Sequence, residues 1–194
     1  MAESPREIAE AVGAHLARVF PKREIARAAL PSSGLVMNLP ELAVFEIAPP
    51  AGEPRVPWLY VTAGASAEPM DDGYGLEFVL CAPVRGPEAA KLVAMVANLH
   101  ADPRYPVSLG QVLEIGHPWL PGASADRLIV ALPAIFDPEL EWLSERTRTA
   151  RFIWLVPITR SEGEFAKQHG LDALQSRLGA AQADVVALGR PSVV

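Results

Sequence analysis

Residues 151–162 read RFIWLVPITRSE and hold the strongest fold signal in the chain. Residues 151–157 are mostly apolar and rich in branched and aromatic side chains, which is typical of a strand inside a sheet. Thr159 to Glu162 then match a capping box, in which a threonine begins a helix and a glutamate three residues later closes the cap. This stretch therefore predicts a buried strand that runs directly into a helix.

Further elements are expected on both sides of this strand. The sequence predicts other strands at 42–48, 56–62, 76–82 and in the region 107–132, and helices over 5–19, from Pro87 to Asp102-Pro103, from Thr159 to Gly170, and over 171–178. In the second helix, one face is expected to carry Leu92, Met95, Val96 and Leu99. Residues 137–148 fit a helix or a loop, and the tail 184–194 begins like a strand.

The strands come in groups and do not alternate strictly with helices. This order favours an α+β fold with a mixed or mostly antiparallel sheet flanked by helices over a doubly wound fold. The length of 194 residues suits one domain, and no repeat or linker divides the chain. We therefore expect a single domain over 1–194.

Composition excludes several classes of protein. Half of the residues are hydrophobic, which is too many for a disordered chain, and 17 basic against 23 acidic residues give a net charge of −6. This acidic balance argues against a nucleic-acid partner. The first residues do not resemble a signal peptide, and no apolar run is long enough to span a membrane. A single cysteine allows no internal disulfide, so a cytoplasmic location is expected.

No short motif predicts catalysis or a cofactor. The four histidines lack the spacing of a metal site, and the two Gly-Ala-Ser segments at 64–68 and 122–126 lack the second glycine of a nucleophile elbow. Cys81 lies in an apolar strand and is expected to be an inert buried thiol. We expect no enzyme, no cofactor and no metal. One alternative stays open, a small hydrolase or transferase whose site is assembled from Asp71, Asp72, His117 and Glu162.

Five segments, in the same order, resemble the suppressor of fused family. They are YVTAGAS at 60–66, GYGLEFVL at 73–80, IGHPW at 115–119, FIWLVPITRSE at 152–162 and GRPSVV at 189–194. The resemblance covers roughly residues 40–194. It implies a non-enzymatic α+β domain that sequesters a protein partner.

The resemblance also implies what kind of partner to expect. The animal relative inhibits the Gli transcription factors of Hedgehog signalling by holding a short peptide as an added strand, and single-domain bacterial relatives look like immunity proteins that neutralise toxins. A basic toxin or an extended peptide is therefore the expected partner. The oligomeric state stays open, because a second copy of the chain is another possible occupant of an apolar groove.

The resemblance maps the acidic peptide-binding position of the family onto Asp71 or Asp72. We predict a partner-binding set of Asp71, Asp72, Tyr74, Glu77 and Trp119. All four tryptophans, Trp58, Trp119, Trp142 and Trp154, are expected in the core in preference to a binding surface. Of the four, Trp119 and Trp142 lie in turn-rich or ambiguous segments, so these two are the better candidates for exposed anchors.

Overall fold

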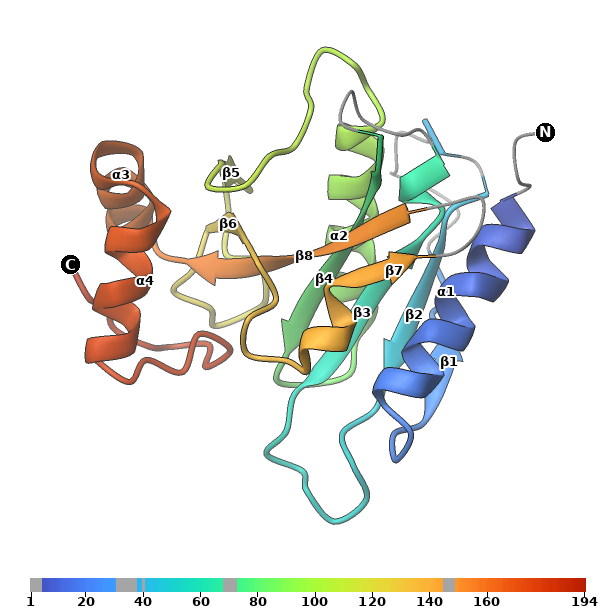
Figure 1. Ribbon diagram of the computed structural model, residues 1–194. Coiled ribbons are helices and arrows are strands. Elements are labelled where there is room, and N and C mark those ends of the chain that lie inside the picture. The colour runs from blue at the N-terminus through green and yellow to red at the C-terminus, as the bar shows by residue number, and fades with distance from the viewer. Residues whose placement is uncertain (1–4, 31–37, 40, 68–72, 145–148) are drawn as a thin grey trace.

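The computed structural model describes residues 5–30, 38–39, 41–67, 73–144 and 149–194, and these form one eight-stranded sheet (Figure 1). Seven strands follow the order β1-β2-β3-β4-β8-β6-β5, and β7 pairs with β8 beside this path. Among the strands of the described residues, only β4 and β8 pair in parallel, so the predicted mixed, mostly antiparallel sheet is confirmed. The strands are β1 (Ile25–Arg27), β2 (Ala43–Ile47), β3 (Trp58–Ala63), β4 (Gly75–Ala82), β5 (Val112–Glu114), β6 (Arg127–Ala131), β7 (Trp142–Ser144) and β8 (Thr149–Ile158).

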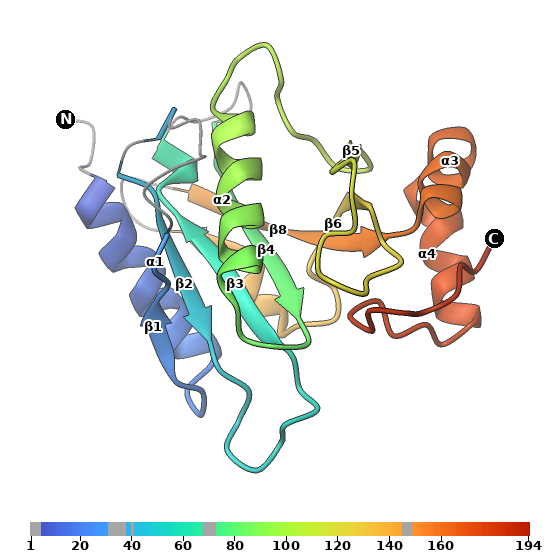
Figure 2. The ribbon, with the colours of Figure 1, turned by 180° about the vertical axis from the view of Figure 1, so that it is seen from behind.

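Helices cover both faces of this sheet. The helix α1 (Pro5–Val19) packs on one face, and α2 (Pro87–His100) packs on the other (Figure 2). At the end of β8 the chain forms α3 (Arg160–His169) and α4 (Leu171–Ala180). The two apolar cores lie on opposite faces, one under each covering helix. No helix among the described residues is long and apolar enough to cross a bilayer.

The predicted passage from β8 into α3 is confirmed in detail. The Thr159 hydroxyl accepts a hydrogen bond from the Glu162 amide at 3.4 Å, and the Glu162 carboxylate accepts one from the Thr159 amide at 2.8 Å. The two bonds satisfy backbone donors that an uncapped helix leaves free. Gly170, at φ 86°, separates α3 from α4 in a conformation that favours glycine.

The tail does not continue as a strand, so that prediction is wrong. The Asp184 carboxylate accepts a hydrogen bond from the Val186 amide at 3.0 Å, and its carbonyl accepts one from the Ala187 amide at 3.1 Å. These bonds close a turn where the pattern had predicted extended backbone. In the region that had fitted either a helix or a loop, the chain forms the short 3-10 turn Pro138–Leu140 and then β7.

The predicted face of α2 is confirmed, because Leu92, Met95, Val96 and Leu99 lie together along one side of the helix. Its sheet side includes small residues that let the helix approach closely, namely Ala89, Ala90, Ala94 and Ala97. Leu92 and Val96 are buried as expected, but Met95 is 46% exposed and Leu99 is 38% exposed. The spacing identified the apolar residues correctly, and it could not tell which of them the sheet would cover.

Candidate functional site

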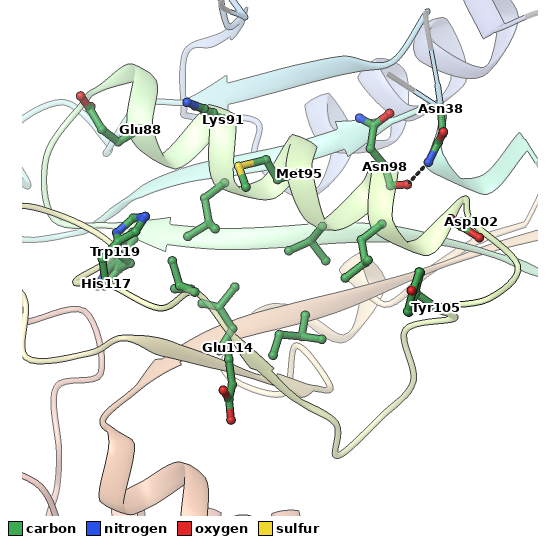
Figure 3. A pocket seen from close by; sticks show the side chains of 16 residues that line it. Asn38, Glu88, Lys91, Met95, Asn98, Asp102, Tyr105, Glu114, His117 and Trp119 are labelled. Atoms are coloured by element: carbon green, nitrogen blue, oxygen red, sulfur yellow. Dashed lines mark hydrogen bonds between the residues drawn. The ribbon is translucent and has the colours of Figure 1, made fainter. Parts of the chain in front are cut away.

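An apolar groove of about 610 Å³ lies between α2 and the β5–β6 hairpin (Figure 3). One wall is α2, the other is formed by β5 and the residues that follow it, and the turn after α2 closes one end. The apolar lining residues come from all of these elements: Leu92, Met95, Val96, Leu99, Tyr105, Leu113, Ile115, Trp119 and Leu128.

Three of the lining side chains are unusually open to solvent. Met95, Leu99 and Tyr105 are 46%, 38% and 54% exposed, and all three line this one groove. Burying a large apolar side chain contributes about 1.5–3 kcal/mol of free energy. A partner that covered these three side chains would therefore gain binding free energy from them. A cluster of this kind is typical of an interaction surface.

Buried hydrogen bonds fix the wall of the groove near Asn98. Its side chain donates to the Ala94 carbonyl and accepts from the Leu39 amide, each at 2.9 Å. The Asn38 side chain donates to the Asn98 carbonyl at 2.9 Å, as Figure 3 shows. These bonds attach residues 38–39 to α2, so this part of the wall is formed before any partner arrives.

Acidic groups lie on the rim. The Arg104 guanidinium hydrogen bonds to Asp102 and lowers the pKa of that carboxyl to about 2. The Lys167 ammonium donates to Glu114 at 2.7 Å, and this bond, with smaller contributions from nearby charges, lowers the pKa of Glu114. Both carboxylates are therefore charged at neutral pH. Glu88 adds a third acid and Lys91 a base.

The strand β5 is the last strand of the sheet order beside the groove. The Ile115 amide donates to the Asp126 carbonyl, and the Val130 amide donates to the Gln111 carbonyl, each at 3.0 Å. In an antiparallel pair the direction of the backbone groups alternates. Those of Val112 and Glu114 therefore point away from β6, toward the edge of the sheet. Such groups can pair with one more strand.

Glu77 is not at the surface. Its side chain is fully buried in β4 and accepts four hydrogen bonds. The donors are the Thr62 hydroxyl at 2.5 Å, the Gly64 amide at 2.9 Å, the Ser66 amide at 3.1 Å and the Ser66 hydroxyl at 2.7 Å. The carboxylate thus holds the turn after β3, and this burial removes it from the surface that a partner can reach.

The other predicted binding residues lie in separate places. Trp119 is only 5% exposed, so it lies in the core and its candidacy as an exposed anchor is wrong. The turn that carries it folds back on the core, and its amide donates to the Ala125 carbonyl. Trp142 is 40% exposed and so lies outside the core, and its ring meets Tyr74 edge to face at 5.1 Å. Asp71 and Asp72 lie outside the described residues.

The residues of the enzyme alternative do not converge in the described structure. Glu162 is fully buried and pairs with Arg190 through two hydrogen bonds of 2.6 and 2.7 Å, whereas His117 is exposed on the groove. Burial raises the pKa of the Cys81 thiol to about 12, so it is no nucleophile at neutral pH. Among the residues that the structure describes, no three metal-ligating side chains form a group.

A mixed α+β sheet with an apolar groove beside its edge strand offers a surface for another molecule, but a fold by itself does not specify a function. The family model described as Suppressor of fused protein (SUFU) matches residues 38–191, and the chain belongs to this family. One solved structure of a family member is the crystal structure of the Sufu-Fu complex.

Solved structures agree with this assignment. A SUFU homologue from Neisseria gonorrhoeae FA 1090 is 28% identical, superposes with a TM-score of 0.82 and matches 97% of this chain and 98% of its own. Sufu in the Sufu-Fu complex is 16% identical, with a TM-score of 0.67 and coverage of 95% and 91%. Drosophila Suppressor of Fused is 14% identical with the same TM-score, and 96% of this chain matches 51% of that one. No curated protein matches the chain.

Proposed function

We propose that this chain binds a protein partner by taking an extended segment of it into the groove beside β5. The observation that carries the proposal is the exposed apolar cluster of Met95, Leu99 and Tyr105 next to the outward backbone groups of an edge strand. Backbone pairing supplies affinity to any extended segment, and the groove selects its side chains.

The partner segment should be extended, with apolar side chains on the face that meets α2. Successive side chains of a strand alternate between its two faces. Leu113 on β5 and Ile115 just after it line the groove and are two residues apart, and an added strand would place its own alternate residues beside these two on the same face of the sheet. The net charge of −6 favours a partner with basic residues beside its apolar ones, whereas Asp102 and Glu114 on the rim already pair with Arg104 and Lys167.

The finer part of the proposal is an immunity role. The resemblance to single-domain bacterial relatives and the acidic charge support a chain that neutralises a basic toxin by occupying part of its surface. An immunity protein meets its toxin in the cytoplasm, and we propose that location. The binding occurs without chemistry on the partner, so no cofactor takes part.

A second proposed contact region consists of Tyr74 and Trp142, with Asp71 and Asp72, which precede Tyr74 in the sequence. Arg151 stacks over the Trp142 ring at 4.9 Å and pairs with Glu141 at 2.6 Å, so this exposed tryptophan is held in place. Fixed aromatic side chains lose little conformational freedom on binding, which suits them as anchors.

The groove is tested by charge substitution. Leu99→Asp and Met95→Asp place a carboxylate in the groove, and Ile135→Asp is the matched control because Ile135 is 64% exposed and does not line the groove. Tagged proteins are purified from native cells, and the products of neighbouring reading frames are co-expressed with each. We expect one partner to be retained by the wild type and by Ile135→Asp, and to fall at least about tenfold with either groove variant.

Equal capture by all four proteins would contradict the groove as the binding site. Protection of cells against a co-expressed neighbouring protein, lost in the groove variants alone, would support the immunity role. Capture without protection would overturn that role and keep the binding proposal.

A further inference from the structure

His100 connects α2 to the turn that closes one end of the groove. It is the last residue of α2, and its Nδ1 accepts a hydrogen bond from the Val107 amide at 3.1 Å. Val107 is fully buried, and the imidazole packs edge to face against the Phe78 ring at 5.5 Å. An amide donor requires an unprotonated nitrogen, so this contact holds the ring neutral at Nδ1.

The residues between His100 and Val107 form part of the groove. Asp102 and Tyr105 line it, and the Tyr105 amide donates to the Asp102 carbonyl at 2.8 Å. At its start, the Asp102 amide donates to the Leu99 carbonyl at 3.1 Å. The hydrogen bond from Val107 to His100 closes the other end of this turn against the helix.

Among the described residues, no free charge faces the imidazole to compensate a proton. On the turn, Asp102 and Arg104 pair with each other at 2.6 Å, and Tyr105 is the other titratable side chain. On β4 the imidazole contacts the apolar ring of Phe78. The carboxylate of the neighbouring residue, Glu77, accepts its hydrogen bonds from β3 and the turn after it, beginning with the Thr62 hydroxyl. Burial accordingly lowers the pKa of His100 from its ordinary value of 6.5.

We propose that His100 is a pH-sensitive latch for the groove, in which a proton on Nδ1 removes the acceptor of the Val107 amide and releases the turn 101–107 from α2. A released turn no longer holds Tyr105 and Asp102 against the groove. The latch deepens the proposed function, since it regulates the same groove, and it predicts that partner binding is strongest at neutral pH and weakens in acid. We expect partner binding to weaken at pH values below the ordinary histidine pKa, because burial in the folded protein disfavours protonation of His100.

The latch can be tested without any partner. Amide exchange is followed by NMR on the ¹⁵N-labelled full chain from about pH 7.5 to about pH 5, with the imidazole signals recorded in parallel. The protection factor of the Val107 amide is expected to fall at least about tenfold, with the same midpoint as the His100 ring. The Gly110 amide, which donates to the Val130 carbonyl at 2.8 Å, is the internal reference and should keep its protection.

His100→Asn is the matched variant, because the asparagine oxygen is bonded to Cγ as Nδ1 is, accepts a hydrogen bond and does not titrate in this range. In it, Val107 protection relative to Gly110 should be independent of pH. Constant Val107 protection in the wild type while His100 titrates would overturn the latch and leave the groove proposal intact. If instead the groove variants capture the partner normally, the groove proposal fails whatever Val107 does.

Discussion

Two carboxylates in this fold are equally buried and have different kinds of partner. Glu77 and Glu162 are each 0% exposed, and each accepts hydrogen bonds from backbone amides. Glu77 receives its remaining bonds from the hydroxyls of Thr62 and Ser66, whereas Glu162 receives them from the guanidinium of Arg190. Hydroxyls can donate or accept, but a guanidinium can only donate. The two sites should therefore respond very differently to the same substitution.

They also differ in what they connect. Glu77 holds residues 62–66, which lie 11 to 15 positions away on the neighbouring strand and its turn. Glu162 reaches Arg190 and the Val193 amide, 28 and 31 positions away, and fixes the C-terminal tail on α3. One site shapes a turn, and the other closes a long segment of chain.

Glu162→Gln should give the largest loss of stability. The amide nitrogen of the new side chain would face the Arg190 donors, and the guanidinium would stay charged in a buried site. Removing one partner of a buried pair costs about 3–5 kcal/mol, to be measured by denaturant unfolding. Glu10→Gln on α1 is the control, because its carboxylate pairs with the exposed Arg6 at the surface, where about 0–1 kcal/mol is expected. Equal losses for both variants would contradict a special role of the buried pair.

Gly75→Ala should come next, because it intrudes on the turn that Glu77 organises. An added Cβ would lie 2.5 Å from the Ser66 carbonyl oxygen, a backbone atom that cannot rotate away. Overpacking of this kind costs about 1–3 kcal/mol. Gly179→Ala is the matched control, since nothing lies within 4 Å of its added Cβ. Thermal unfolding of the two variants measures the difference. A Gly75→Ala protein as stable as the Gly179→Ala control would contradict the expected clash, because the backbone at Ser66 would then move without a measurable cost.

Glu77→Gln should be the mildest of the three. The retained oxygen keeps the bonds from Gly64 and Ser66, and the new amide nitrogen donates to the Thr62 hydroxyl, which reverses its role. The expected loss is about 1 kcal/mol, typical of one altered hydrogen bond. Glu77→Ala, which leaves buried donors without an acceptor, should cost clearly more in the same urea titration. A Gln variant as damaged as the Ala variant would remove the distinction between the two carboxylates.

The sequence predicted well what depends on neighbours along the chain. The α3 cap was evident because Thr159 and Glu162 are three residues apart and bond to each other. The resemblance drew attention to the segments that contain Glu77 and Arg190, but not to their bonds, since those partners lie far away in sequence. Nothing local distinguishes a carboxylate that binds a partner from one that closes a turn.

The groove was missed for a related reason. The apolar residues Met95 and Leu99 were found, but alanines on the opposite side decide how closely α2 approaches the sheet, and that contact involves distant strands. Trp119 was a candidate anchor because turns usually lie at the surface, and its burial depends on how residues 118–125 fold onto the core. Exposure is a property of the assembled fold, so the site follows from tertiary packing.

The smallest expected effect is a difference in acid sensitivity. Burial alone would raise the pKa of Glu162, but the hydrogen bonds from Arg190 and from the Thr159 amide outweigh it and lower that pKa below 4.5. A carboxyl with a lowered pKa in the folded state contributes stability that is present above its unfolded pKa. This contribution is lost as the pH falls through the lowered value. The melting temperature of the wild type should therefore decrease more steeply below about pH 4.5 than that of Glu162→Gln, which has no carboxyl to protonate there. If the melting temperatures of the two proteins changed with pH in parallel, the pair with Arg190 would not be what lowers the pKa of Glu162. The contrast with Glu77 would then rest on geometry alone.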